Sequence, residues 1–237
     1  LETGCKYSTL AYNEEVKKGI KIESRLTSTT AYVVKTKTLD IICFRGTQQL
    51  GDWLFNISAI PVPYAGRLCH GGFVAAHASV WRKIKKHIAK LHKKHNRLSL
   101  VTFGKPNTFF KGFKRPMNLV KQISLVSGSD VVARIPRLCY GASVSQKMIY
   151  FANDGTDRTN PTSDFKKQDF MSKKGEAISD HFMPGYEERL FHFIERQNKM
   201  KRQAQTSTKS RAAKSKNGLT KEEEVEFKKL IGEDSYD

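Results

Sequence analysis

The chain has 237 residues, of which 38% are hydrophobic and 10% aromatic, enough for one domain of moderate size with a hydrophobic core. Its formal charge of +19 at pH 7 attracts polyanions such as nucleic acid, anionic lipid headgroups or acidic protein surfaces, but no zinc finger or RNP-type motif supports nucleic acid in particular. No run approaches the ~18 apolar residues of a membrane span, and the first thirty residues, which begin with Leu1 rather than Met, lack the apolar stretch of a signal peptide and assign no compartment.

Two β-strands joined by a tight turn are predicted over 31–34 and 39–44, and the apolar run of the second predicts that it is buried. A helix is predicted over 74–96, because one face carries apolar residues at helical spacing: Val80, Ile84, Ile88 and Leu91. The other faces carry no acid and seven basic residues: Arg82, Lys83, Lys85, Lys86, Lys90, Lys93 and Lys94. Solvation is the ordinary role of such a face, and contact with an anionic interface is the alternative.

Three further short strands are predicted from apolar runs bounded by turn residues, at 98–103, 119–126 and 148–151. The first of them is expected to be buried and to end at Gly104-Lys105-Pro106. Apolar strands in the order strand, helix, strand and loop favour an α/β sheet.

The C-terminal part begins with a polar loop predicted over 153–164 and a helix over 187–197, with its inward face formed by Leu190, Phe191 and Ile194. Residues 198–218 hold seven Lys and Arg, no acid and no aromatic residue, so disorder is expected there. A short amphipathic helix follows over 220–231. We therefore divide the chain into a folded domain, 1–197, and a basic tail, 198–237, which is either a linker with a mobile helix or a docking peptide for a protein partner.

The four cysteines lie far apart in the sequence, at Cys5, Cys43, Cys69 and Cys139. They form no Cys-x-x-Cys motif, which makes the disulfide signal weak and the zinc signal poor. Buried free thiols are the expectation.

Two motifs in the first half follow the predicted strand over 39–44: Phe44-Arg45-Gly46-Thr47, and then Asp52-Trp53 with His70-Gly71-Gly72-Phe73. They resemble the oxyanion-hole half of the class 3 (fungal-type) lipases, a family of α/β-hydrolases. In that family the residue after the glycine helps to stabilise the oxyanion, so the resemblance implies that role for Thr47. It implies a packing and hydrogen-bonding role for His70, rather than a catalytic one.

Two motifs in the second half extend the resemblance to about residues 30–195. The stretch from Ser129 to Pro136 resembles the loop that carries the triad aspartate, which falls on Asp130, although an aspartate here is also an ordinary turn residue. Asp180-His181-Phe182, followed by Tyr186, resembles the terminal Asp-His motif, which makes His181 the general base. The chain order Asp and then His is that of α/β-hydrolases.

The nucleophile that should complete this set is missing, because no Gly-x-Ser-x-Gly occurs in the 237 residues. In the family a strand, a serine elbow and a helix precede the strand that here begins near Ser99. The nearest imitation, Gly141-Ala142-Ser143-Val144-Ser145, follows the aspartate and lacks the second glycine, while Ser99 has no glycine neighbours. Three explanations stay open: the sequence is a piece that omits this unit, the deletion is real and gives a pseudoenzyme, or another residue replaces the serine.

The resemblance implies an α/β-hydrolase-like fold, with a mostly parallel central sheet flanked by helices and one strand–elbow–helix unit missing. It implies hydrolysis of lipid esters, triacylglycerol or phospholipid, by a Ser-His-Asp mechanism that needs no metal or organic cofactor. The cationic surface favours an anionic membrane or particle as the partner. The alternative is a catalytically dead module that binds a lipid surface, a protein or a polyanion.

Overall fold

The computed structural model describes residues 1–13, 16–17, 19–36, 40–46, 60–95, 98–110, 120–135, 140–141, 147–172 and 179–216. The chain divides into two units, Leu1–Phe191 and His192–Asp237, and the division falls inside the helix α5. The helices are α1 (Glu2–Tyr12), α3 (Gly71–His95), α4 (Ser163–Ser172) and α5 (Met183–Lys216), with 3-10 turns η1 (Val132–Arg134) and η2 (Ser179–His181). The strands are β1 (Gly19–Ser24), β2 (Thr29–Lys35), β3 (Asp40–Phe44), β4 (Pro61–Tyr64), β5 (Arg67–His70), β6 (Leu98–Phe103), β7 (Phe109–Phe110), β8 (Val120–Ser127), β9 (Tyr140–Gly141), β10 (Lys147–Phe151) and β11 (Asp157–Thr159).

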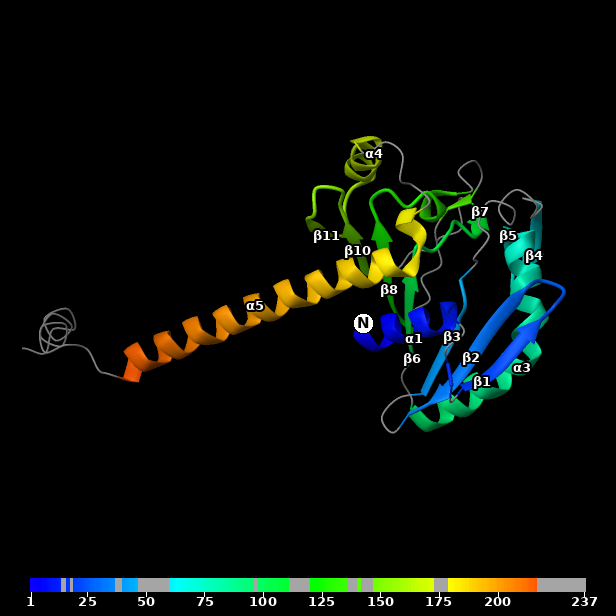
Figure 1. Cartoon of the computed structure of the whole chain (residues 1–237), viewed down its shortest axis with the longest axis horizontal. Coiled ribbons are helices and arrows are strands. Elements are labelled where there is room, and N and C mark those ends of the chain that lie inside the picture. The colour runs from blue at the N-terminus through cyan, green and yellow to red at the C-terminus, as the bar shows by residue number, and fades with distance from the viewer. Residues whose placement is uncertain are drawn as a thin grey trace, which may run out of the picture. The chain divides into compact units, whose positions relative to one another are not determined.

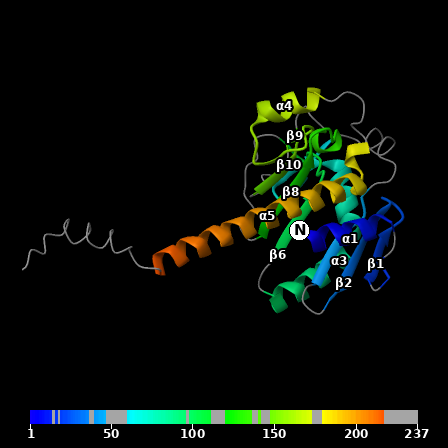
Figure 2. The ribbon, with the colours of Figure 1, turned by 60° about the vertical axis from the view of Figure 1, so that its left-hand side comes forward.

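The first sheet has the order β1-β2-β3, and both of its pairings are antiparallel. Its middle strand divides its side chains between two cores. Ala31 and Val33 pack with Val80 of α3, whereas Tyr32 and Val34 belong to a second cluster against α1. Alternate residues of a strand point to opposite faces of its sheet, so α1 and α3 cover the two faces, as Figures 1 and 2 show. This double cover explains why the middle of β2, from Ala31 to Val34, is apolar without interruption.

The second sheet has the order β11-β10-β8-β6, in which β6, β8 and β10 are parallel and β11 is antiparallel to β10. This is the predicted mostly parallel sheet flanked by helices (Figure 1). The three parallel strands end at Phe103, Ser127 and Phe151. In open α/β sheets, ligands bind outside these carboxyl ends. The third sheet, β4-β5-β7-β9, is antiparallel throughout.

Two strands predicted to be buried are more exposed than expected. In β3 only Cys43 is buried and Phe44 is 49% exposed, while Leu100 of β6 is 40% exposed. The reason is their position, since β3 and β6 each stand at the end of their sheet within the described part of the chain. The helical prediction over 74–96 is confirmed by α3, and Val80 and Ile84 are buried as its spacing predicted.

Three predictions for the C-terminal part need correction. The polar loop 153–164 contains β11 and the start of α4. Phe191 is 59% exposed rather than inward, because the helix turns Leu190 toward the core at the adjacent position. Residues 198–216 are helical within α5 instead of disordered, although every described side chain from 198 to 208 is exposed. Residues 217–237, with the predicted helix over 220–231, lie outside the described residues.

The prediction of free thiols is confirmed for Cys5, Cys43 and Cys69, which are buried and form no disulfide, whereas Cys139 lies outside the described residues. Burial raises the pKa of the Cys5 thiol to about 11, so that it stays protonated at neutral pH. In the described part of the chain, no helix has the length and apolarity needed to cross a bilayer.

Candidate functional site

Asp130 lies on the loop that follows the carboxyl end of β8, and its side chain is wholly buried. The backbone N–H of Asp130 donates to the carbonyl of Ser127 at 3.2 Å, which closes the turn after the strand. The backbone N–H groups of Val132 and Ala133 donate to Asp130 Oδ1 at 2.8 and 3.3 Å. An aspartate that accepts from the backbone N–H groups two and three residues later is fixed in one orientation.

His181 ends the 3-10 turn η2, immediately before α5. Its Nδ1 lies 3.0 Å from both Oδ1 and Oδ2 of Asp130, and its side chain is 15% exposed. An ionised carboxylate offers only acceptors, so Nδ1 carries the hydrogen in this pair. The other ring nitrogen, Nε2, is then the one that accepts a proton. The structure thus brings together the residues that the sequence predicted as the triad aspartate and the general base.

Tyr186, in the first turn of α5, makes the shortest hydrogen bond to Asp130. Its hydroxyl donates to Asp130 Oδ2 at 2.6 Å and accepts from the backbone N–H of Ser127 at 3.0 Å. Complete burial and the nearby Asp130 charge hold the pKa of Tyr186 well above its usual range, so it remains a donor. Tyr186 follows the Asp180-His181-Phe182 motif in the sequence, but the motif predicts no role for it.

Gly104 closes the other side of the pair at the carboxyl end of β6. Its φ of +55° lies in the left-handed region that favours glycine. A Cβ atom on this residue would overlap Asp130 Oδ2 and lie 2.7 Å from His181 Nδ1. The backbone of β6 therefore approaches the pair more closely than any other residue type allows. In the sequence, Gly104 is only the glycine at which the predicted strand over 98–103 ends, and such a glycine indicates a turn.

A second polar network holds the loop that carries Asp130. Ser129 Oγ donates to Asn153 Oδ1 at 2.7 Å, and Asp169 of α4 accepts from the Asn153 backbone N–H at 3.0 Å. Arg134 donates to the carbonyl of Gly128 at 2.9 Å. These contacts tie the loop to the residues after β10 and to α4, so two segments distant in sequence help to position the carboxylate.

The turn that carries His181 is anchored in a similar way through its neighbour Asp180. Asp180 Oδ2 accepts from Ser127 Oγ and from the guanidinium of Arg189, both at 3.3 Å. Arg189 also donates to the carbonyl of Phe151 at 3.3 Å. Both parts of the pair are therefore held at the carboxyl ends of β8 and β10.

Other sequence candidates are placed elsewhere or remain untested. Thr47, the predicted oxyanion residue, and Ser143 lie outside the described residues. Ser99 is exposed on β6. His70 is buried, its ring centre lies 4.8 Å from that of Phe73, and burial lowers its pKa. In the ranges that the structure describes, no hydroxyl or thiol is hydrogen-bonded to His181 Nε2.

Comparison with solved structures shows which fold the chain has. The parallel sheet with flanking helices is that of the α/β-hydrolase fold. More particularly, the chain has the fold of the fungal triacylglycerol lipases.

Three of these structures are similar to the chain at low sequence identity. The triacylglyceride lipase of Rhizomucor miehei has 13% identity and a TM-score of 0.54, with 66% of this chain and 80% of that chain covered. A triacylglycerol lipase of Penicillium expansum has 13% identity and a TM-score of 0.54, with coverages of 75% and 88%. A triacylglycerol lipase described as having a serine protease triad as its catalytic centre has 14% identity and a TM-score of 0.56, with coverages of 70% and 87%. No family model and no curated protein matches the sequence.

Replacement of Tyr186 by phenylalanine is expected to lower the free energy of unfolding by about 2 kcal/mol, because it removes a donor from a buried carboxylate and leaves the Ser127 N–H without its acceptor. Chemical denaturation measures this change. Tyr7→Phe is the matched control. Tyr7 of α1 is partly buried against the cluster that contains Tyr32 and Val34, and its hydroxyl makes no hydrogen bond within the described ranges. Equal losses in the two variants would contradict the role assigned to the Tyr186 hydroxyl.

Proposed function

We propose that this protein is a lipase-like carboxylic ester hydrolase that acts on lipids, triacylglycerol or phospholipid, through a Ser-His-Asp mechanism. The observation that carries the proposal is the Asp130–His181 pair, with Nδ1 3.0 Å from the carboxylate at the carboxyl edge of the parallel sheet. A fold shared with triacylglycerol lipases supports it, as does the serine protease triad reported for one of them. A lipid is therefore the proposed substrate.

In this mechanism His181 Nε2 takes the proton of the nucleophilic hydroxyl as that oxygen attacks the ester carbonyl. The imidazolium then gives the proton to the departing alcohol, which leaves an acyl-enzyme for water to hydrolyse. Asp130 holds the ring with Nε2 facing the substrate and stabilises its positive charge. We assign oxyanion stabilisation to Thr47, on its place in the motif. The proposed reaction uses no metal or organic cofactor.

The nucleophile itself stays unassigned, so a second candidate function is kept as the alternative. The sequence has no Gly-x-Ser-x-Gly, and the missing unit falls between α3 and β6, a strand that stands at the end of its sheet within the described residues. A molecule that truly lacks the unit is a catalytically dead module with a lipase-type fold. Such a module would bind a lipid surface, a protein partner through its tail, or a polyanion through its positive charge.

One experiment separates these two functions. The folded chain is treated with a serine-directed phosphonate, and its hydrolysis of a soluble short-chain ester and of a triacylglycerol emulsion is measured. For the hydrolase we expect one labelled serine and a loss of about 10⁶-fold in kcat for His181→Ala. His192→Ala, an exposed histidine of α5, is the control and should keep full activity. A folded chain with neither labelling nor hydrolysis contradicts the hydrolase and leaves the dead module.

A further inference from the structure

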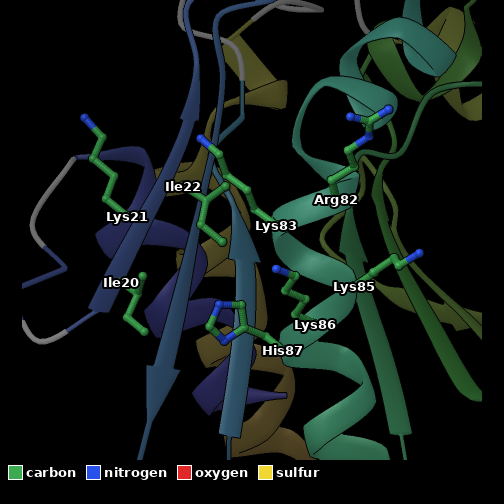
Figure 3. Close-up of a pocket in the computed structure, with 8 residues that line it drawn as sticks. All are labelled: Ile20, Lys21, Ile22, Arg82, Lys83, Lys85, Lys86 and His87. Atoms are coloured by element: carbon green, nitrogen blue, oxygen red, sulfur yellow. The ribbon is translucent and has the colours of Figure 1, made fainter.

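A cationic groove runs between β1 and α3, with a volume of about 640 Å³ (Figure 3). Figure 3 shows that its lining side chains come from these two neighbouring elements. No acid is among the residues that line it, and five of them are basic: Lys21, Arg82, Lys83, Lys85 and Lys86. A concave surface lined by charges of one sign concentrates counterions of the other sign.

The charge arises from the amphipathic pattern of α3. The helix buries Val80 and Ile84 against the sheet, so the residues between them face outward. The sequence of α3 has no acidic residue, and no partner four residues away neutralises its lysines. One neighbouring acid, Glu23 of β1, lies 3.4 Å from Lys21. The cations of α3 keep the groove strongly positive.

Exposed apolar side chains accompany these cations. Ile20 in the groove is 51% exposed, and Leu26 in the turn between β1 and β2 is 92% exposed. The next residue, Thr27, has its hydroxyl 2.7 Å from that of Ser79, one helical turn before Arg82. The turn that carries Leu26 is therefore held against α3 at Ser79, near the start of its run of cations.

We propose that the groove, together with Ile20 and Leu26, docks the protein onto the surface of an anionic phospholipid bilayer. Basic side chains bind the negative headgroups, while neighbouring apolar side chains enter the acyl boundary. Each lysine or arginine at such a surface strengthens binding roughly fivefold. A nucleic acid also binds cations, but it offers no apolar medium for Leu26, so the exposed leucine favours a membrane. Docking needs no turnover and does not depend on the proposed hydrolase activity.

The test is sedimentation of the full chain with phosphatidylcholine vesicles that contain or lack phosphatidylserine. We expect binding that requires phosphatidylserine and falls at least roughly tenfold in the double variant Lys83→Glu/Lys86→Glu. The matched control is Lys199→Glu/Lys201→Glu, which removes the same charge from exposed positions of α5 and should bind at nearly the wild-type level. Circular dichroism verifies that both variants fold.

Leu26→Ser separates a membrane from a polyanion. Its binding to the phosphatidylserine vesicles should fall several-fold, while its binding to a short RNA should match that of the wild type. Equal losses in the two double variants would show that net charge, not the groove, controls binding and would overturn the proposal. Equal binding to vesicles with and without phosphatidylserine would also overturn the proposal, as would vesicle binding that Leu26→Ser leaves unchanged.

Discussion

Gly104→Ala is expected to lower the free energy of unfolding by about 3 kcal/mol or more and to separate His181 from Asp130. The added Cβ would overlap Asp130 Oδ2 and lie 2.7 and 2.9 Å from Nδ1 and Cε1 of the imidazole. It would also impose a φ of +55° on a residue with a side chain, at a cost of about 1–2 kcal/mol. The two effects add, because the buried carboxylate is held by its other donors and cannot move away.

Gly66→Ala separates the two effects. Gly66 also has a positive φ, +74°, but a Cβ there would meet nothing within 4 Å. This variant should therefore show only the backbone cost of about 1–2 kcal/mol. Denaturation curves of both variants measure the difference. Equal losses of stability in Gly104→Ala and Gly66→Ala would contradict the close approach of Gly104 to Asp130 and His181.

The second large effect is expected for Asp130→Ala, which should lower the free energy of unfolding by about 3–5 kcal/mol. The buried carboxylate accepts hydrogen bonds from four donors: His181 Nδ1, the Tyr186 hydroxyl and the backbone N–H groups of Val132 and Ala133. Alanine leaves all four without an acceptor in a site with little access to water. The cost comes from those unpaired donors rather than from lost packing.

The matched control is Asp154→Ala, which removes the same charge from an exposed turn where Asp154 accepts hydrogen bonds from Thr156. Its effect should be much smaller, because water replaces those hydrogen bonds. Asp130→Asn adds a second comparison, since the amide retains one acceptor oxygen and should recover part of the loss. Equal stabilities of Asp130→Ala and Asp154→Ala would contradict the network described around Asp130.

Patterns in the sequence located the helix α3, the strands β2, β3, β6, β8 and β10 and the start of α5, but not α1, α4 or the remaining strands. The apolar spacing of α3 depends on neighbours a few residues away, and the prediction of this helix is confirmed, as is that of the strand over 31–34. Burial of a strand depends also on what lies at its edges, which the sequence of that strand does not contain. For this reason the apolar runs of β3 and β6 predicted buried strands, whereas both stand at the ends of their sheets within the described residues.

The candidate site was predicted in part. Asp130 and His181 were located by motif and chain order, and the structure brings them into contact. The supporting residues are set by contacts across long stretches of chain: Tyr186 lies 56 residues after the carboxylate to which it donates. No local pattern encodes such a contact, and Gly104 is indistinguishable in sequence from any glycine that ends a strand.

The ends of β3 and β6 also bear on the missing serine elbow. Removal of a central strand exposes apolar surface whose burial stabilises the fold by many kcal/mol. The total free energy of unfolding of a native protein is only about 5–15 kcal/mol. Phe44 and Leu100, exposed on the two strands, are the side chains that such a strand would be expected to cover. Within the described residues, β3 and β6 each stand at the end of a separate sheet.

The most direct test of the central claim, that Asp130 and His181 form a carboxylate–imidazole pair, is heteronuclear NMR of the histidine rings in the folded chain. The account predicts that His181 carries its hydrogen on Nδ1, as a slowly exchanging, strongly downfield proton, and that Asp130→Asn removes this signal. A His181 ring with its hydrogen on Nε2, unaffected by Asp130→Asn, would contradict the pair and every functional proposal built on it.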